Sequence, residues 1–385
     1  MNIRYLFIPN PKTVIFKTYA VLEINFFSII NIVRKELFYH QQPNIMKNKS
    51  FFMLCTALLF VNQIHANIPY QVNSKLTRTT NDTLIVESSV APKNDTKTVS
   101  NKQLTIKVSP HGAELCSIFA NGKEYLWQAD PTFWQRQSPI LFPIIGSLWE
   151  NEYRNEGITY TLAQHGFARD MEFTLISEKP DEVRFQLLSN EETLSKYPFP
   201  FCLEVGYRIK GKQIEVIWEV KNPGNKVMHF QIGAHPGFYY PDFNASIEDR
   251  GYLGFGKAEN LKHLLISEKG CTDSSIDYTL NLTDGLLPLN THTFDKDALI
   301  IENEQIHEVT LYNKDKKACL SLHFNAPVVG LWSPAAKNAP FICIEPWYGR
   351  CDEVHFKGEY KDRDWMNHLK PGDSFKGGYV IEIKE

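Results

Sequence analysis

Apolar and polar residues alternate with a period of two along most of the chain after Asn101, the pattern of half-buried β-strands. In Gln213–Val220, positions 214, 216, 218 and 220 are apolar, and three of the four residues between them are polar. Similar runs occupy 104–108, 183–188, 203–209, 309–312, 319–324 and 379–383. The body shows no long amphipathic helix, and only Glu191–Lys196 is expected to form a helical turn.

Turn sequences such as Lys210-Gly211 and Asn222-Pro-Gly-Asn225 separate these predicted strands. Short strands joined by turns at this spacing are typical of a large antiparallel sandwich. A β-sandwich can use about 250 residues as one unit, so the length does not require a division. We therefore predict an all-β fold in which residues 101–385 form a single large antiparallel β-sandwich domain.

The first hundred residues lack this alternation. Residues 46–66 have a basic start, an apolar stretch at Phe51–Val61 and a small residue at Ala66, which predicts a secretory signal peptide too short to span a bilayer stably. We interpret residues 1–45 as a non-native upstream extension, with an uncleaved anchor as the alternative, and expect residues 67–100 to form a flexible leader. The expected location is periplasmic or extracellular, without stable membrane insertion after cleavage.

Composition narrows the functional classes. With 41 basic and 44 acidic residues and no Lys/Arg-rich run, the chain lacks the positive field that nucleic-acid binding requires. The seven cysteines form no CxxC pair and no zinc-site spacing, so no metal is predicted. The aromatic content of 13% fits a β-rich protein that stacks on flat ligands. The oligomeric state leaves no readable signal in the sequence.

Three segments carry candidate chemistry: His165-Gly-Phe-Ala-Arg169, Gly233-Ala-His235-Pro-Gly237-Phe238 and Ile344-Glu345-Pro346-Trp347-Tyr-Gly349. The glycines and proline around His235 hold an unusual backbone path, and an imidazole near neutrality can give a proton to a sugar ring oxygen. Glu345 follows an apolar strand, where a carboxylate is costly to bury without a function or a fixed partner. We predict catalysis by both, with a structural ion pair as the alternative for Glu345.

Further residues are candidates for binding a sugar. His165 and Arg169 offer hydrogen-bond donors to hydroxyl groups. Trp347 and Trp332 are candidate platforms for a pyranose ring, with core packing as the alternative for Trp332. Two carboxylates close to the motifs are candidate hydroxyl acceptors, namely Asp352 and Asp242, and the alternative for Asp242 is the capping of a turn.

The chain resembles the galactose mutarotase (aldose 1-epimerase) superfamily, in its compact bacterial branch. The resemblance covers Gln103–Ile383 and includes Leu141–Gly146, Gln164–Asp170, Tyr197–Phe199, Ile232–Phe238 and Ile342–Trp347. It implies a single β-supersandwich that needs no cofactor. It further implies that His235 is the general acid, Glu345 the general base and His165 a contact to the sugar.

The resemblance implies opening and closure of the sugar ring, so we predict an aldose 1-epimerase that interconverts the α and β anomers of a free aldohexose. Better-known members carry an arginine after the first glycine-containing motif, whereas Ser147 follows here, and Arg169 is the candidate substitute. A sister branch acts on hexose 6-phosphates, and Arg136 with Arg169 would form its phosphate clamp. The export signal argues against a phosphorylated substrate. The sequence also fits a non-catalytic carbohydrate-binding protein of the same fold and, more remotely, a polysaccharide lyase on a related sandwich.

Overall fold

The computed structural model describes residues 2–6, 70–78, 84–92 and 96–384. Two compact units divide the chain, residues 1–94 and residues 95–385, and each is described by itself. The predicted signal peptide at 46–66 lies outside the described residues, as does the predicted extension at 1–45 apart from Asn2–Leu6. No helix among the described residues has the length and apolar character needed to cross a membrane.

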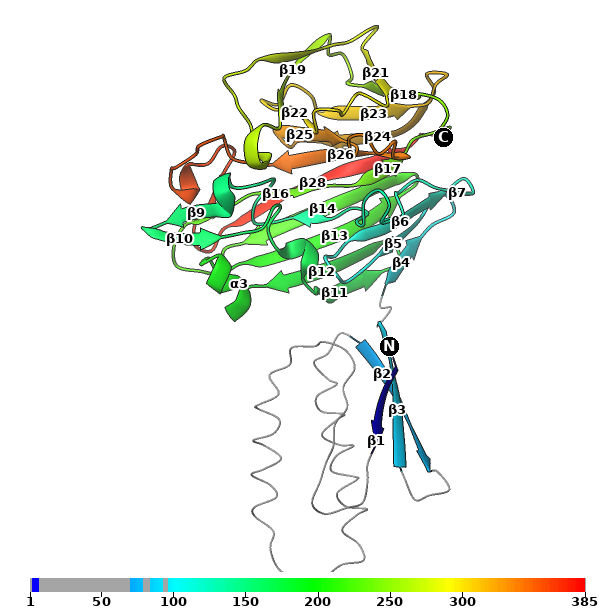
Figure 1. Ribbon diagram of the computed structural model, residues 1–385, viewed down its shortest axis with the longest axis vertical. Coiled ribbons are helices and arrows are strands. Elements are labelled where there is room, and N and C mark those ends of the chain that lie inside the picture. The colour runs from blue at the N-terminus through cyan, green and yellow to red at the C-terminus, as the bar shows by residue number, and fades with distance from the viewer. Residues whose placement is uncertain (1, 7–69, 79–83, 93–95, 385) are drawn as a thin grey trace, which may run out of the picture. The chain divides into compact units, whose positions relative to one another are not determined.

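The larger unit contains a nine-stranded antiparallel sheet (Figure 1). The C-terminal strand β28 lies in its middle, between strands from the first and the second half of the unit. In spatial order, the strands are β11 (Thr174–Lys179), β12 (Glu182–Leu188), β13 (Cys202–Lys210), β14 (Gln213–Lys221), β28 (Ser374–Ile383), β24 (Ala318–Phe324), β23 (Glu308–Tyr312), β18 (Asp249–Gly254) and β21 (Leu286–Asn290).

A second sheet of eight strands carries the candidate chemistry. Strand β26 is central to it, because β25, β16 and the short strand β17 (Gly237–Tyr239) all pair with β26. Apart from β17, the strands of this sheet lie in the order β20 (Tyr278–Asn281), β19 (Asn260–Leu265), β22 (Leu299–Ile301), β25 (Val328–Trp332), β26 (Phe341–Tyr348), β16 (Ile232–Ala234) and β8 (Ile140–Leu141). Strand β8 lies at the edge of this sheet, in a segment where Pro139 and Pro143 could not donate the hydrogen bonds of a central strand.

Smaller elements complete the unit. A four-stranded sheet is formed by β4 (Lys97–Ser100), β5 (Thr105–Val108), β6 (Leu115–Ala120) and β7 (Lys123–Glu124). Two further pairs of strands are β9 (Glu152–Asn155) with β10 (Ile158–Thr161), and β15 (Met228–Phe230) with β27 (Asn367–Leu369). The helical segments are α3 (Glu191–Lys196) and the single turns η1 (Trp149–Asn151), η2 (Ala168–Asp170), η3 (Glu268–Gly270) and η4 (Tyr360–Asp362). Helix α3 is the helical turn expected from the sequence, and a capping box between Asn190 and Thr193 starts it.

The leader predicted at 67–100 differs from the structure. Strand β4 pairs with β5 and buries Val99, so the folded body begins about four residues before the predicted boundary. In the smaller unit, β1 (Asn2–Leu6), β3 (Leu84–Pro92) and β2 (Tyr70–Arg78) form a three-stranded antiparallel sheet. Residues 70–78 and 84–92 therefore form paired strands within the segment that we expected to be a flexible leader, and the pairing supplies their backbone hydrogen bonds.

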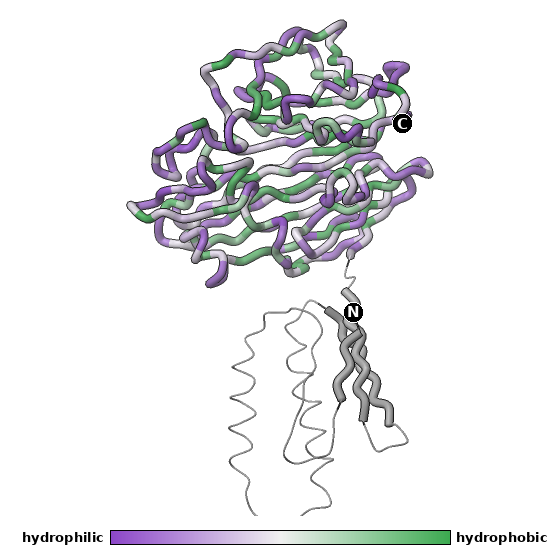
Figure 2. The backbone as a smooth tube through the Cα atoms, in the orientation of Figure 1, coloured by the Kyte–Doolittle hydropathy of each residue, from purple (hydrophilic) through white to green (hydrophobic). Residues whose placement is uncertain are grey.

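The two large sheets share one hydrophobic core. Trp218 of β14 and Leu322 of β24 belong to the same buried cluster as Ile344 of β26. The alternating positions predicted on β14, from Ile214 to Val220, are all buried. Hydrophilic residues gather mainly in the loops that bound the unit (Figure 2). The all-β antiparallel sandwich predicted from the sequence is thus confirmed.

Candidate active site

The two faces of β26 have different surroundings, and this places the candidate base. Ile342 and Ile344 point into the main core, whereas Cys343 and Trp347 belong to two smaller clusters on the other face. Because side chains alternate along a strand, Glu345 shares the face of Cys343 and Trp347. Its side chain is only 1% exposed. The predicted base is therefore a carboxyl group buried on the face of the sheet that is turned away from the sandwich core.

The register of two neighbouring strands places His235 above this carboxyl group. Gly233 of β16 pairs with Trp347, and Gly237 of β17 pairs with Cys343. His235, in the middle of the connection, consequently lies opposite Glu345. Its Nε2 atom is 3.3 Å from Oε2 of Glu345. Oε2 of Glu345 and Nδ1 of His235 are buried without hydrogen-bond partners in the described part of the chain.

Burial shifts the pKa values of this pair in opposite directions. Desolvation, reinforced by the negative charge of Asp297, raises the pKa of Glu345 well above its usual range. Desolvation, reinforced by the positive charges of Arg169 and Arg136, lowers the pKa of His235 to about 3. Both shifts favour the neutral form of each group in the free protein, a protonated carboxyl group on Glu345 and an unprotonated imidazole on His235. Moving this proton to the imidazole produces a carboxylate and an imidazolium without changing the total charge.

His165 lies against the other side of His235. Its ring centroid is 5.6 Å from that of His235, with the two rings nearly perpendicular. The backbone N–H of Gly146 donates to Nδ1 of His165 over 3.1 Å, so a neutral ring must carry its hydrogen on Nε2. Desolvation and the neighbouring His235 lower the pKa of His165 well below the usual histidine value. His165 is thus a neutral imidazole with one N–H donor available.

Aromatic side chains surround the pair. Trp134 stacks on the His235 ring with a centroid separation of 4.7 Å, and Trp332 meets the same ring edge-on at 5.4 Å. Trp332 therefore lies at the site, as predicted. Trp134 was missed, although the adjacent aromatic residues Phe133 and Trp134 just before Arg136 were a signal. The two tryptophans form an aromatic corner that holds the imidazole and excludes water from one side of it.

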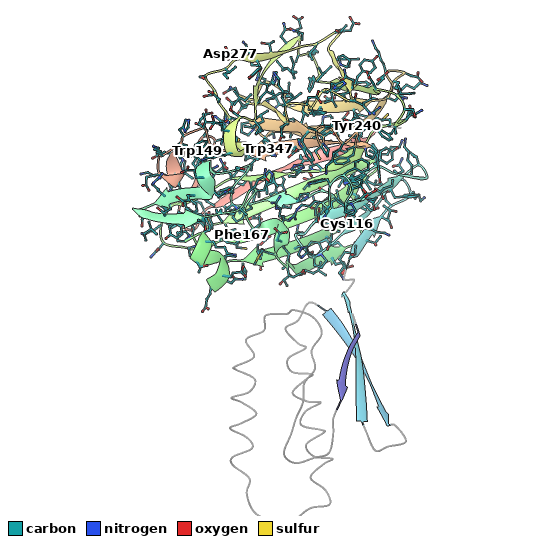
Figure 3. The ribbon with its side chains drawn as sticks, viewed as in Figure 1. Cys116, Trp149, Phe167, Tyr240, Asp277 and Trp347 are labelled. Atoms are coloured by element: carbon teal, nitrogen blue, oxygen red, sulfur yellow. The ribbon has the colours of Figure 1, made fainter. Side chains whose placement is uncertain are left out.

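Trp347 lies at the site in a different way from the one predicted (Figure 3). Its indole ring occupies the space left by two glycines, because a Cβ atom at Gly330 or at Gly233 would come within 2.7 Å of the ring. The side chain is 5% exposed, so it does not form an open platform for a sugar. The pKa of Glu345, raised mainly by burial, is lowered in part by Trp347. Trp347 is therefore a buried side chain that packs beside the carboxyl group.

Arg136 and Arg169 share one acidic partner. Nη2 of Arg136 donates to Oδ1 of Asp170 over 2.8 Å, and Nε of Arg169 lies 3.8 Å from Oδ2 of the same carboxylate. Nη2 of Arg169 also donates to the carbonyl of Gln164 over 2.7 Å. Both arginines lower the pKa of His165 and His235, after the larger effect of burial. The structure thus brings the predicted arginines together beside the two histidines, but with an acidic partner between them.

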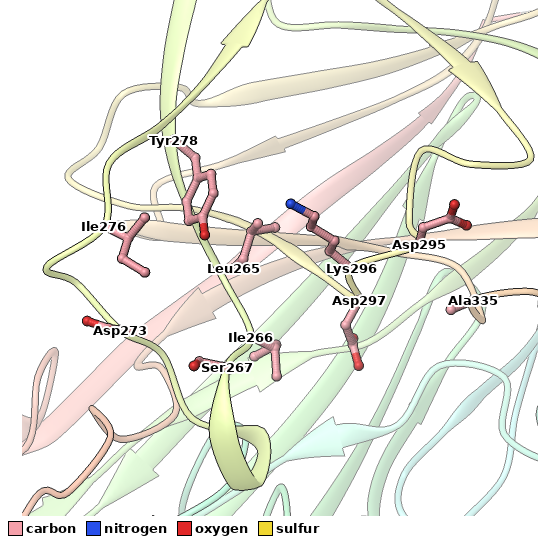
Figure 4. Close-up of a pocket in the computed structure, with 10 residues that line it drawn as sticks. All are labelled: Leu265, Ile266, Ser267, Asp273, Ile276, Tyr278, Asp295, Lys296, Asp297 and Ala335. Atoms are coloured by element: carbon pink, nitrogen blue, oxygen red, sulfur yellow. The ribbon is translucent and has the colours of Figure 1, made fainter.

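Asp297 is a site residue that sequence reasoning missed. It lines a pocket of about 430 Å³ together with Leu265, Ser267, Tyr278 and Asp295, and Figure 4 shows these side chains around the pocket. After burial, the charge of Asp297 is the second cause of the raised pKa of Glu345. The charge of Asp297 therefore acts on Glu345 from the lining of this pocket. Its place two residues before the buried strand β22 is the sequence signal that could have indicated it.

Comparisons with known proteins agree with this geometry. The family model described as aldose 1-epimerase matches residues 95–382. The chain belongs to the aldose 1-epimerase family. The chromosomal protein LacX of Lactococcus lactis subsp. lactis is 33% identical over 294 residues, which cover 74% of this chain and 98% of LacX. Membership in the family places the chain among the isomerases and implies a sugar as the small molecule that it binds.

Two solved structures have the same fold. The galactose mutarotase related enzyme of Lactobacillus acidophilus is 33% identical, with a TM-score of 0.72 and coverage of 75% of this chain and 97% of that one. A galactose mutarotase-like protein of Lactobacillus casei is 29% identical, with a TM-score of 0.70 and coverage of 75% and 100%. The family and the fold predicted from the sequence are thus confirmed.

Two predicted binding residues of this aldose 1-epimerase family member have other roles. Asp352 is buried, its Oδ2 accepts the backbone N–H of Trp149 over 2.8 Å, and its Oδ1 pairs with the buried guanidinium of Arg363. Each oxygen of Asp352 thus already has a partner inside the protein, and its contact to sugar hydroxyls stays a prediction. Asp242 lies in an exposed turn with a positive φ of 55°, and its carbonyl accepts from Lys314 over 3.1 Å. No contact between Asp242 and the acid/base pair occurs in the described structure.

Replacing Asp352 with Asn is expected to lower stability rather than sugar binding. The change removes one partner of a buried ion pair, which costs about 3 kcal/mol because the Arg363 charge is left without its partner. Chemical denaturation measures the loss, and KM for the sugar should stay within the error of the wild type. Asp242→Asn, in its exposed turn, is the matched control and should change stability by about 0.5 kcal/mol or less. An unchanged stability with a raised KM would restore Asp352 as a sugar ligand.

Proposed function

We propose that this protein is a mutarotase that interconverts the α and β anomers of a free aldohexose by acid/base ring opening. The observation that carries the proposal is the contact of 3.3 Å between Nε2 of His235 and Oε2 of Glu345, in a pair that shares one proton. A reversible exchange between anomers needs one group that takes a proton from the anomeric hydroxyl and one that gives a proton to the ring oxygen. A purely structural histidine would ordinarily have a partner for its buried Nδ1 atom, which has none among the described residues.

The reaction begins when the proton of Glu345 moves to His235 as a sugar enters and hydrogen-bonds to both groups. The Glu345 carboxylate then takes the proton of the anomeric hydroxyl while the His235 imidazolium protonates the ring oxygen. The bond between C1 and the ring oxygen breaks, and the aldehyde rotates about the bond between C1 and C2. On closure His235 takes the proton of the ring hydroxyl and Glu345 protonates the aldehyde oxygen. The proton on His235 then returns to Glu345 as the product leaves. Each group contributes about 10² to 10⁴-fold to the rate.

The surrounding residues support this assignment. Nε2–H of His165 is the donor that can hold a sugar oxygen beside His235, since Nδ1 already accepts from Gly146. The corner formed by Trp134 and Trp332 offers apolar faces to the C–H groups of the ring. Asp297 supplies a carboxylate that can accept from sugar hydroxyls at the pocket. These contacts hold a pyranose between the acid and the base.

A mutarotase for hexose 6-phosphates is the second candidate, and the Arg136–Asp170–Arg169 group favours it. Two guanidinium groups side by side form a common phosphate site. However, Asp170 already neutralises part of their charge, and its carboxylate would repel a phosphate. The export signal predicted at 46–66 also supports a non-phosphorylated sugar, because sugar phosphates are mainly cytoplasmic. We therefore propose an exported enzyme that acts on a free sugar.

The test is an anomer-exchange assay on freshly dissolved α-glucose, α-galactose and α-glucose 6-phosphate, followed by polarimetry or by exchange NMR. The full-length protein is expected to accelerate equilibration of at least one free sugar over buffer. A higher kcat/KM for the 6-phosphate would assign the protein to the second candidate. Sugar binding without any acceleration would make the protein a carbohydrate-binding module.

Replacing Asp297 with Asn is expected to weaken sugar binding more than turnover. The loss of a charged hydrogen-bond acceptor costs about 1.5 kcal/mol or more, which corresponds to a rise in KM of about tenfold. Steady-state kinetics measures this change. Asp295→Asn is the matched control, because Asp295 lines the same pocket but, unlike Asp297, is not among the charges that raise the pKa of Glu345. Equal effects of the two substitutions would show that Asp297 has no specific contact to the sugar.

A further inference from the structure

We propose that His235, Cys343 and Glu345 form a binding site for a thiophilic divalent transition metal, with Zn²⁺ as the representative ion, and that an ion bound there stops catalysis. Only the claim that a bound ion stops catalysis rests on the proposed function. Metal binding itself is measured separately from mutarotation. The site offers one nitrogen, one sulfur and one oxygen ligand from three side chains. Zinc accepts each of these ligand types.

The register of the eight-stranded sheet brings the three ligands together. Cys343 and Glu345 are two residues apart on β26 and share one face, and the connection from β16 to β17 places His235 over both. One ligand atom from each residue lies within 4.8 Å of the others. Zinc–ligand bonds of about 2.0 to 2.3 Å at tetrahedral angles place ligand atoms about 3.3 to 3.7 Å apart. Side-chain shifts of about 1 Å therefore close the site around an ion.

Two of the three ligand residues are available to bind an ion. Oε2 of Glu345 is buried without a hydrogen-bond partner in the described chain, and Cys343 is a free cysteine with no exposed surface. His235 is the most exposed of the three at 9%, so an ion reaches the site from its side. A mixed nitrogen, sulfur and oxygen set selects zinc and similar ions over Mg²⁺ and Ca²⁺, which prefer oxygen alone. The fourth coordination position is left for water.

Metal binding has a defined proton balance. The Cys343 thiol loses its proton to become a thiolate, and the acid/base pair loses the single proton that it shares. The ion therefore replaces two protons and holds His235 as a neutral ligand and Glu345 as a carboxylate. Neither can then donate a proton to a ring oxygen. The expected result is reversible inhibition in which zinc and sugar compete for the same groups.

Cys343 also packs against Trp127 and Phe341, which is the ordinary environment of a buried thiol. A thiol that only fills space would not respond to a metal. Cys343→Ser separates the two roles, because serine keeps the size of the side chain and removes the sulfur ligand. Cys343 takes no part in the proton transfers proposed above, so the variant should retain the activity of the wild type in the absence of metal.

The experiment titrates Zn²⁺ into the full-length protein in metal-free buffer and follows both heat of binding and anomer exchange. Co²⁺ replaces Zn²⁺ in a parallel titration, because a cobalt–thiolate bond adds a charge-transfer absorption. We expect the wild type to bind one ion, to show this absorption and to lose activity, and a chelator to restore activity. Cys343→Ser should bind Zn²⁺ at least about tenfold more weakly than the wild type. It should also lack the cobalt–thiolate absorption and keep its activity when Zn²⁺ is added. Cys202→Ser, on β13 of the other sheet, is the matched control and should behave as the wild type.

Failure of the two proposals can be told apart. If the wild type binds no ion, or if Cys343→Ser binds it as tightly and shows the same absorption, the metal site is refuted whatever the activity. If the protein binds zinc through Cys343 but never accelerates anomer exchange, the metal site stands and the proposed function fails. Should Cys343→Ser fold poorly, Cys343→Ala tests the same ligand, because alanine suits the apolar surroundings better.

Discussion

Replacing Glu345 with Gln is expected to lower kcat for anomer exchange by about 10³-fold, the typical contribution of a positioned acid/base group. The amide cannot take the proton of the anomeric hydroxyl, and the pair loses the one proton that His235 would receive from it. The fold should be unaffected, because burial raises the pKa of Glu345 and so favours a neutral carboxyl group, which glutamine matches in size and charge. Exchange NMR measures the rate, and thermal unfolding checks the stability.

The control for this substitution is sugar binding. The variant should still bind the sugar, with an affinity close to that of the wild type, since most contacts to the ring come from other residues. Wild-type turnover by Glu345→Gln would assign the base to another group. Loss of both binding and stability would instead make Glu345 a structural residue, the role that a fixed ion pair would give it.

Replacing His235 with Asn is expected to reduce kcat by about 10² to 10⁴-fold, because the neutral His165 nearby is a much weaker acid than the His235 imidazolium. His292→Asn is the control, since His292 is exposed and hydrogen-bonded to Asp295. Residual activity above about one tenth of the wild type in His235→Asn would contradict the role of general acid. Rescue of the variant by added imidazole would support that role.

The pH dependence of the wild type tests the same residue without a mutation. The active pair carries one proton, and a second proton would remove the base. Burial lowers the pKa of His235 to about 3, so the second proton binds only in strong acid. The value of kcat/KM should therefore stay constant as the pH falls through the usual histidine pKa of about 6.5. A loss of activity centred near that usual value would show that His235 titrates as an exposed imidazole.

The sequence was informative where the signal is local. Alternation along residues 213–220 predicted a strand, and the structure buries the predicted positions on β14. The positions of glycine and proline around His235, and of Glu345 after an apolar run, predicted the pair that the structure brings to 3.3 Å. Residues without such a local context were missed. Trp134 and Asp297 join the site from segments about 100 residues before and 60 residues after His235.

The predicted residues that the structure places differently have a common physical cause. Asp352 follows the third motif closely and carries the right functional group, but its partner Arg363 comes close only in the folded chain. Trp347 is next to the base in sequence as predicted, yet Gly330 and Gly233 on the two neighbouring strands make room for its ring inside the sheet. In each case, contacts across strands decide whether a side chain is available to a ligand.

The amino-acid sequence by itself determined the class of fold and pointed to the candidate acid/base pair, because strand periodicity and the residues around His235 and Glu345 are local properties. The tertiary structure alone decided the geometry and the environment of these two groups. Strands β16 and β17 both pair with β26, which sets His235 over Glu345 and Cys343. Burial at that place shifts both pKa values toward the neutral forms of the two groups. Desolvation depends on everything that packs around a group, and a linear sequence does not contain that information.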